Sequence, residues 1–517
     1  MQRLLAACLI GLGAAALTGM PRIRAQVNTS SAPASAPVSG QPKSQGHTAV
    51  APKACMLPGT SAQSLREVVD AAYSLQPPLA SDAMIRIAAK VASPCPALAI
   101  KLLQDAFDQA SRVEPETANT LAPASVLTDS RIYSQEQAYS LQMDRLSLQS
   151  RAALALAPLN PKMAIQLFRQ IPIPRPPAAS CESVFVPEVS VYYEALGKVY
   201  ALLKAQKSRN DAEAQAQFLQ LQEVAGATTS PVQLLPLAKV LDAADPTALE
   251  LSSLLGSIAA AIERFPIDDN SFYARGHYPA VQAKERLLAL AAQKRLPSYA
   301  LQHSFREYLN RSLNSPHCAD SEPMDFKKLV KLYESFNRSP SVEEIEPLSV
   351  PATAPPLEPQ PDDGSYWLRP KAKNLLEDAR NLNFDDSSRR YTDADRKTPK
   401  WQDRVRHLLT DLDDWNASDE PDPAAYYHQR CILVIEVLGY LPPGELYDRV
   451  VAEWISTFSE STLQWDQPAE WYLRITQFLK YSKTRRGGPA TLTAIGSLKN
   501  SPNSNLHALG VLADFLR

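Results

Sequence analysis

Proline interrupts the apolar segments of this chain at the spacing expected between helices. The sequence has 43 prolines but only 17 glycines in 517 residues. Proline ends a helix or occupies its first turn, whereas sheet-rich folds depend on turns that contain glycine. Apolar residues make up 45% of the chain, which is enough for a globular fold. We therefore expect an all-α fold, and a chain this long should form several domains or an elongated array.

The same pattern surrounds two prolines that lie 65 residues apart. The segments are AAKVASPCPALAIKLL, residues 88–103, and ALALAPLNPKMAIQLF, residues 153–168. When Pro161 is aligned on Pro96, alanines, isoleucines and leucines fall at matching positions, as do two arginines just upstream, Arg86 and Arg151. The matched positions before each proline have helical spacing, so the proline ends one helix and begins the next. The sequence predicts two copies of a helix-turn-helix hairpin.

Several residues are predicted to cap these helices. Asn160 should be the N-cap of the helix that begins at Pro161. Ser81 or Asp82 should cap the helix upstream of the first proline. A weaker third copy surrounds Pro246, where Asp245 is the expected cap.

The second helix of the hairpin resembles that of tetratricopeptide and related α-solenoid repeats. The pattern of that family is Ala-x3-Phe-x2-Ala-x4-Pro; it is fitted with one change by Ala164, Phe168, Ile171 and Pro176, and without the proline by Ala99, Leu103 and Ala106. The tryptophan, Leu-Gly and tyrosine positions of the family's first helix are not matched. The resemblance covers about residues 80–180 and implies stacked helix pairs, whose concave surface holds peptides or protein partners.

The N-terminus has the pattern of a secretory signal over residues 1–25. Arg3 precedes an apolar run from Leu4 to Leu17, which is shorter than the roughly 20 residues that a membrane-spanning helix needs. We expect cleavage near Ala25 and export to the periplasm, the cell envelope or the extracellular space. The alternative is an uncleaved segment that would be the chain's contact with a membrane.

Composition divides the remaining chain into four parts. Residues 26–60 are rich in proline, serine and alanine, and are expected to form a disordered tether. Helical periodicity over 61–339 predicts the helical-repeat domain. A proline-rich linker covers 340–363, and a C-terminal helical domain covers 364–517. The strongest sign of this boundary is that all six tryptophans lie beyond the linker.

Export favours disulfide bonds among the cysteines. Four of them lie in polar or proline-containing segments, which predicts two disulfides among Cys55, Cys95, Cys181 and Cys318; all three pairings remain open. Cys431 lies in an apolar helix pattern and is expected to be a buried free thiol. Zinc ligation would need a second cysteine–histidine pair beside His317-Cys318 or His428/Cys431, so we expect no metal.

Three groups of residues resemble reactive sites, and a simpler structural role is favoured for each. The acidic loop from Asp411 to Asp422 lacks the glycine and the final glutamate of a calcium-binding EF-hand loop. Asp466 and Glu470 are flanked by tryptophans, as in sugar sites, but one helical turn places both carboxylates on the same side. The histidines form no spaced pair; His303/Glu307 and His407/Asp411 are expected surface pairs.

The sequence contains no catalytic motif and no phosphate-binding glycine loop. A net charge of −2 provides no global field to attract nucleic acid. We therefore expect a scaffold or adaptor of the cell envelope that binds a protein or peptide, without catalytic residues or cofactor. The alternative is an α/α enzyme that acts on polysaccharide or peptidoglycan and uses the tryptophan-rich C-terminal region.

Overall fold

The computed structural model describes only part of the chain. The described residues are 62–113, 142–176, 178, 188–205, 211–266, 277–314, 317–318, 330–331, 334, 357–358, 370–385, 389–416, 426, 430, 433–434, 437–442, 444–460 and 489–516. They belong to one unit, Ala54–Arg517. The expected signal segment and tether, and nearly all of the expected linker, lie outside the described residues. The domain boundaries therefore stay a prediction.

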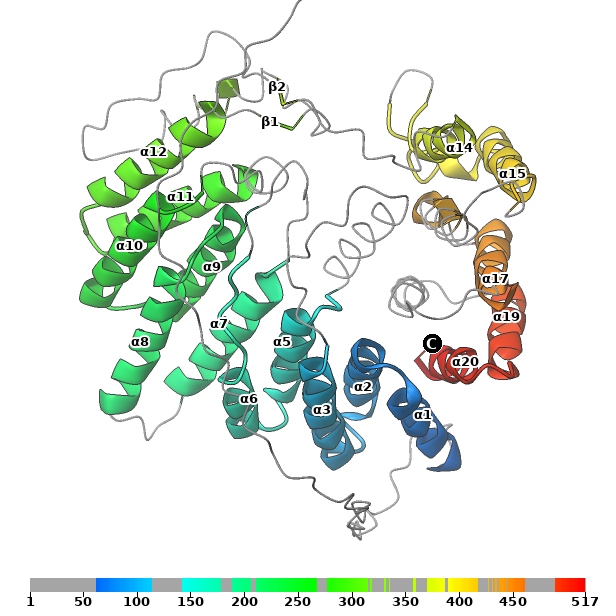
Figure 1. Ribbon diagram of the computed structural model, residues 1–517, viewed down its shortest axis with the longest axis horizontal. Coiled ribbons are helices and arrows are strands. Elements are labelled where there is room, and N and C mark those ends of the chain that lie inside the picture. Colours follow the sequence, from blue (N-terminus) through cyan, green and yellow to red (C-terminus); the bar gives the residue numbers. More distant parts are fainter. Residues whose placement is uncertain are drawn as a thin grey trace, which may run out of the picture. The chain divides into compact units, whose positions relative to one another are not determined.

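Helices make up almost all of the regular structure in the described residues, which confirms the all-α prediction (Figure 1). The first group consists of α1 (Ala62–Ser74), α2 (Pro77–Val91), α3 (Pro96–Ser111), α5 (Arg145–Leu156), α6 (Pro161–Phe168), α7 (Ser190–Lys204), α8 (Asp211–Gly226), the 3-10 turn η1 (Pro231–Gln233), α9 (Leu234–Ala244), α10 (Ala248–Glu263), α11 (His277–Gln293) and α12 (Tyr299–Asn314). The second group consists of α14 (Pro370–Asn381), η4 (Asp395–Lys397), α15 (Pro399–Asp413), α17 (Glu445–Glu460), α19 (Pro489–Lys499) and α20 (Ser504–Leu516). Two short strands, β1 (His317–Cys318) and β2 (Leu357–Glu358), pair in parallel.

Proline begins helices where the sequence predicted it. Pro96 is the first residue of α3 and Pro161 is the first residue of α6. The side chain of Asn160 accepts a hydrogen bond of 3.2 Å from the backbone N–H of Met163, which confirms it as the N-cap. Proline is tolerated at this position because the first N–H of a helix has no partner within the helix.

Two predicted caps were wrong. Asp82 lies inside α2, which begins five residues earlier at Pro77 and has no side-chain cap. Asp245 ends α9 in a left-handed conformation with φ 46°, and Thr247 caps α10 instead. Thr247 and Glu250 form a reciprocal capping box, which satisfies two backbone N–H groups and therefore takes the helix start from Asp245.

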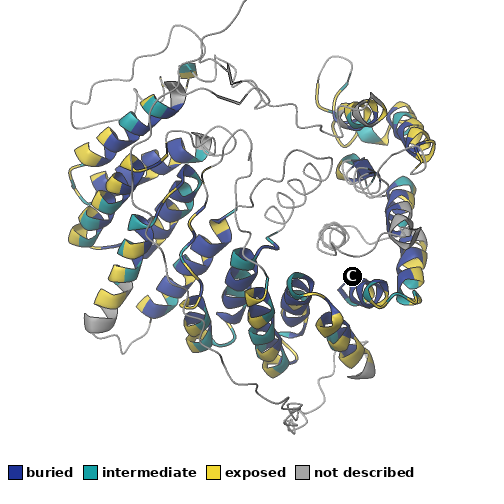
Figure 2. Ribbon diagram, in the orientation of Figure 1, coloured by how far each residue is buried: buried dark blue, intermediate teal, exposed yellow. Residues whose placement is uncertain are grey.

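Helix α2 packs most extensively on the next helix, α3, whereas the later helices of the first group pack mainly on the next helix but one. One series of contacts joins α3 to α5, α5 to α7, α7 to α9 and α9 to α11, and a second joins α8 to α10 and α10 to α12. Figure 2 shows buried residues along the faces where these helices meet. The matched alanines Ala88, Ala99, Ala153 and Ala164 are all buried, as small residues at close helix contacts should be.

The last helices pack in sequence and return to the start of the described chain. Helix α19 packs on both α17 and α20, and α20 packs on α1. Gly510 allows the close approach of α19 and α20, since a Cβ atom there would lie 2.5 Å from the backbone nitrogen of Lys499. The Lys90 amine donates a hydrogen bond to the carbonyl of Phe515 and lies 4.7 Å from the centre of its ring. No helix among the described residues is long and apolar enough to cross a membrane.

A buried carboxylate joins helix α2 to helix α5. Asp82 of α2 is completely buried. Its oxygens accept hydrogen bonds from Arg86 at 2.6 Å and from Arg151 of α5 at 2.5 Å. Arg151 also donates to the backbone carbonyl of Gln142 at 3.1 Å. The two arginines that the sequence alignment matches therefore share one counter-ion, and this shared ion pair links α2 to α5.

We predict that Asp82→Ala lowers the free energy of unfolding by about 3–5 kcal/mol, because it leaves two largely buried guanidinium groups without their carboxylate. The measurement is urea unfolding followed by circular dichroism. Asp403→Ala is the control, since Asp403 forms an exposed ion pair with Arg406 and its removal should have little effect. Equal losses in the two variants would contradict a structural role for the buried ion pair.

Candidate functional site

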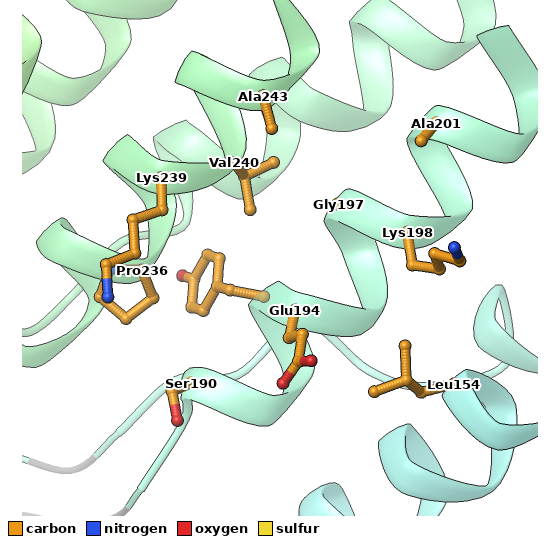
Figure 3. Close-up of a pocket in the computed structure, with 11 residues that line it drawn as sticks. Leu154, Ser190, Glu194, Gly197, Lys198, Ala201, Pro236, Lys239, Val240 and Ala243 are labelled. Carbon is orange, nitrogen blue, oxygen red and sulfur yellow. The ribbon is translucent and has the colours of Figure 1, made fainter.

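A cavity of about 510 Å³ lies between helices α5, α7 and α9 (Figure 3). We call it the α7–α9 groove. One side is formed by α7, through Ser190, Tyr193, Glu194, Gly197, Lys198 and Ala201. The other residues are Pro236, Lys239, Val240 and Ala243 of α9 and Leu154 of α5. The volume is within the range of natural ligand pockets, about 300–1,000 Å³.

Helical periodicity places these residues on single faces. The lining residues of α7 recur at spacings of three and four, and so do those of α9. Three of the lining residues are small, namely Gly197 and Ala201 on α7 and Ala243 on α9. A Cβ atom at Gly197 would lie 3.7 Å from the side chain of Val240, which is ordinary contact. The absence of larger side chains at these positions leaves the space open.

Hydrogen bonds hold α7 and α9 together at both ends of the groove. Near the start of α7, the hydroxyl of Tyr193 accepts a 3.1 Å hydrogen bond from the side-chain amide of Gln233, the residue before α9. At the other end, the amine of Lys204 donates a 3.1 Å hydrogen bond to the carbonyl of Ala244. These are the last residues of α7 and α9, so the bond satisfies a helix C-terminal carbonyl with a cation. The spacing of the two helices is therefore set before any ligand binds.

Gln233 is the centre of a buried hydrogen-bond network behind the groove. Its side chain is completely buried. Besides Tyr193, its NH₂ group donates to the carbonyl of Pro174 at 2.9 Å, and its oxygen accepts from the backbone N–H groups of Thr229 and Ser230. Both donors and both acceptor sites of the amide are used. This one side chain connects the segment before α7, helix α7 itself and the turn that starts α9.

Tyr193 lines the groove and does not act as an acid or a base. Burial raises the pKa of its hydroxyl well above the ordinary value, and the hydrogen bond from Gln233 lowers it only in part. Its ring packs edge-on against Tyr192, with ring centres 5.4 Å apart. The phenol therefore stays protonated and fixed at neutral pH.

Three charged side chains surround the opening. Glu194 and Lys198 of α7 and Lys239 of α9 are exposed. No ion pair is found for any of them within the described part of the chain. In the view of Figure 3, the Lys239 amine lies beside Pro236, and the Lys198 amine lies on the other side of α7. The Glu194 carboxylate lies between them in this view. The groove thus combines a largely apolar interior with a rim of net positive charge.

Helix α5 also carries buried polar groups, away from the groove. Asp144 caps this helix by accepting a 2.9 Å hydrogen bond from the N–H of Ser147. Among the described residues, its second oxygen finds no hydrogen-bond partner, and neither do the hydroxyls of Ser147 and Ser150. Burial raises the pKa of Asp144 to about 6, although the hydrogen bonds from Ser147 act in the opposite direction. A carboxylate in this environment costs stability when it is ionised.

The predicted cysteine sites are described in only one case. Cys95 is disulfide-bonded and lies at the N-cap of α3. The side chains of Cys55, Cys181, Cys318 and Cys431 lie outside the described residues. The two-disulfide arrangement therefore stays a prediction.

The described residues of the segments that resemble reactive sites do not line the groove. Asp466 and Glu470 lie outside the described residues, and so does the end of the acidic loop; Asp413 of that loop forms an ion pair with Arg430 at 3.0 Å. The ring of His303 stacks on Tyr299, while Glu307 pairs with Arg306 at 2.8 Å.

The tryptophans described in the C-terminal region belong to the core. Trp401, Trp415 and Trp454 are all buried, with exposed fractions of 1% or less. Trp401 donates a hydrogen bond of 2.9 Å to the carbonyl of Leu382, and Trp415 packs edge-on against Tyr426. These rings are not available to stack on a sugar, so they do not support the alternative polysaccharide site.

Within the described residues, no three His, Cys, Asp or Glu side chains are grouped as a metal site requires.

Comparisons with protein-family models, with curated proteins and with solved structures find no match to this chain. The resemblance to tetratricopeptide-like repeats therefore stays an expectation.

Our sequence analysis did not identify the groove residues, although a signal is present. The segment PEVSVYYEALGKVYALLKAQ has a second face made of Ser190, Glu194, Gly197, Lys198 and Ala201, opposite its apolar face. Small residues between charged residues on one helical face indicate a surface that a partner can approach closely. Gln233 gave no comparable signal, because its partners come from separate segments.

We predict that Gln233→Leu lowers the free energy of unfolding by about 2–4 kcal/mol, because it leaves the buried carbonyl of Pro174 and the buried N–H of Ser230 without their partner. The measurement is urea unfolding. The matched control is Gln222→Leu, which removes one partly exposed hydrogen bond of 3.0 Å to Ser253 and should cost no more than about 1 kcal/mol. A loss as small as that of the control would contradict the network.

We predict that Asp144→Asn is more stable than the original chain above pH 6, by on the order of 2 kcal/mol. The folded carboxyl has a raised pKa, so its contribution to stability is present below pH 4 and is lost as the pH rises through 6. Asparagine removes the charge and keeps the oxygen that caps α5. Unfolding measured from pH 4 to pH 8 should show the two proteins converging at low pH.

The control is Asp144→Ala, which loses the cap and should be the less stable of the two variants at pH 4. Parallel pH profiles for Asp144→Asn and the original chain would contradict the raised pKa.

Proposed function

We propose that this protein is an exported α-solenoid-like scaffold that binds a peptide segment of a partner protein in the α7–α9 groove. The observation that carries this proposal is the groove itself. Its interior is largely apolar, its opening has charges for which the described residues provide no ion-pair partner, and its helices are held together at both ends. Such a site suits the side chains of a peptide and is formed in advance of binding.

Two observations support a stacked-repeat arrangement. Alternate helices contact one another from α3 to α11, as successive units of a helical array would. The arginines matched by the sequence alignment, Arg86 and Arg151, pair with the same carboxylate of Asp82. Repetition in the sequence thus coincides with a contact between units.

The remaining parts of the proposal rest on the sequence. A signal segment at 1–25 and a tether at 26–60 would place the scaffold in the periplasm, in the cell envelope or outside the cell. Two disulfides among the four polar-segment cysteines would suit that environment. A C-terminal helical domain after the linker at 340–363 would complete the chain.

We predict that Gly197→Leu abolishes peptide binding, because the added side chain extends from α7 into the groove beside Val240. Linear peptides would first be selected from a display library on the full chain. Their dissociation constants would then be measured by fluorescence anisotropy for the original protein and for each variant.

The matched control is Gly256→Leu. Gly256 lies within α10, is exposed, and has no atom within 4 Å of the position that a Cβ would take. Both substitutions add the same side chain and remove a helical glycine, so neither should weaken its helix. Binding that survives in the control and is lost in Gly197→Leu supports the groove as the site. Equal binding by both variants, or no selected peptide, would overturn the proposal.

A further inference from the structure

Helix α20 joins the second group of helices to the first. Among the described elements, the extensive contacts between the two groups are those of α20 with α1 and, to a lesser extent, with α2. We infer that α20 is a docking helix for the surface formed by α1 and α2, and that this contact keeps the two groups bound to each other even when the chain between them is cut. The partner that fits this surface is therefore a part of the same chain.

Helix α1 has an apolar face that its neighbour in the sequence does not cover alone. Its buried residues Leu65, Val68, Ala72 and Leu75 recur at spacings of three and four, which makes one apolar stripe. Helix α1 packs more extensively on α20 than on α2, although α2 follows it directly in the chain. If α20 were removed, part of this stripe would therefore be exposed to water, which is unfavourable for apolar surface.

Helix α20 is buried on all sides, so α19 alone cannot account for its burial. Six consecutive residues, 508–513, are buried, and one turn of a helix contains about 3.6 residues. Gly510 faces α19, because a Cβ atom there would lie 2.5 Å from the backbone nitrogen of Lys499. The opposite side of α20 needs a second surface, and the contacts of this helix identify that surface as α1.

Helical periodicity indicates which residues of α20 face the first group. Leu512 is two positions after Gly510, which places it on the other side of the helix, and Phe515 follows about one turn later. Phe515 contacts α2, because the amine of Lys90 donates a hydrogen bond to its carbonyl and lies 4.7 Å from the centre of its ring. The buried Leu512 therefore lies on the face of α20 that docks on the first group.

Lys90 adds a polar contact to this docking surface. The last carbonyls of a helix have no partner within that helix, and a cation near them is favourable. Phe515 is next to Leu516, the last residue of α20, so the Lys90 amine satisfies a carbonyl at this helix end. The two residues are 425 positions apart in the sequence. This contact favours one position of α20 on the surface of α1 and α2.

The test cuts the full chain between the two groups. A recognition sequence for a site-specific protease would be inserted between Glu358, the end of β2, and Pro370, the start of α14. The folded protein would be cleaved and analysed by size-exclusion chromatography with a reducing agent, so that no disulfide holds the fragments together. We expect the two fragments to elute together as one particle. Elution as two separate particles would overturn the inference.

Matched substitutions test whether α20 makes the docking contact. Leu512→Asp places a charge in the docking surface and should weaken the association of the cleaved fragments at least tenfold. Leu492→Asp is the control, because it makes the same change on α19 at a leucine that is 41% exposed. Lys90→Ala leaves α20 itself unchanged and should weaken the association several-fold. Sedimentation of the cleaved proteins over a dilution series would give each dissociation constant. Equal dissociation constants for Leu512→Asp and Leu492→Asp would contradict docking through α20.

Photo-crosslinking in the uncut chain tests the contact without depending on a destabilised variant. The substitution Phe515→p-benzoylphenylalanine introduces a crosslinking group in place of a similar ring. After irradiation, mass spectrometry should find α20 linked to peptides of α1 or α2, such as the peptide that contains Lys90. Links formed solely within the second group would overturn the inference, even if Leu512→Asp had separated the fragments.

Discussion

The groove depends on hydrogen bonds that hold two parallel helices, α7 and α9, at both of their ends. Gln233 joins their starts through Tyr193, and Lys204 joins their ends at the carbonyl of Ala244. Between these points Gly197 and Ala201 of α7 and Ala243 of α9 are small, so these positions extend no side chain that could fill the space. An open groove in a helical protein would otherwise collapse, since protein interiors pack at high density. Here the open space follows from fixed end points and short side chains together.

The fold class and the positions of helix starts were predictable because they depend on local chemistry. Proline at a first helical position and an asparagine before it act within one turn, which is why α3 and α6 begin where the sequence indicates. The two wrong cap predictions have different causes. Asp82 is a residue type that favours N-cap positions, but its carboxylate is paired with Arg151, which lies 69 residues away in the chain. Asp245 lost its expected role to the capping box of Thr247 and Glu250, a local pattern that the analysis overlooked.

The candidate site was less predictable, because a groove depends on which helix faces remain uncovered after the helices have packed. The face of α7 that contains Gly197 and Lys198 can be read from helical spacing, but an exposed face of this kind is usually only a solvated surface. Its significance comes from Lys239 and Val240 of α9, which lie on the opposite side of the groove. The buried amide of Gln233 illustrates the same limit. Its partners at Pro174 and Tyr193 lie 59 and 40 residues away, and no short-range pattern indicates that they meet.

The contacts that hold the helices together involve residues other than the charged side chains of the groove. The faces of α7 and α9 that pack on neighbouring helices bury apolar residues, and the connections between helices satisfy buried polar groups through Asp82 and Gln233. Tyr193 and Val240 of the groove belong to the core, whereas Glu194, Lys198 and Lys239 are exposed and form no ion pair with the described residues. Exposed charges of this kind cost little while they are hydrated.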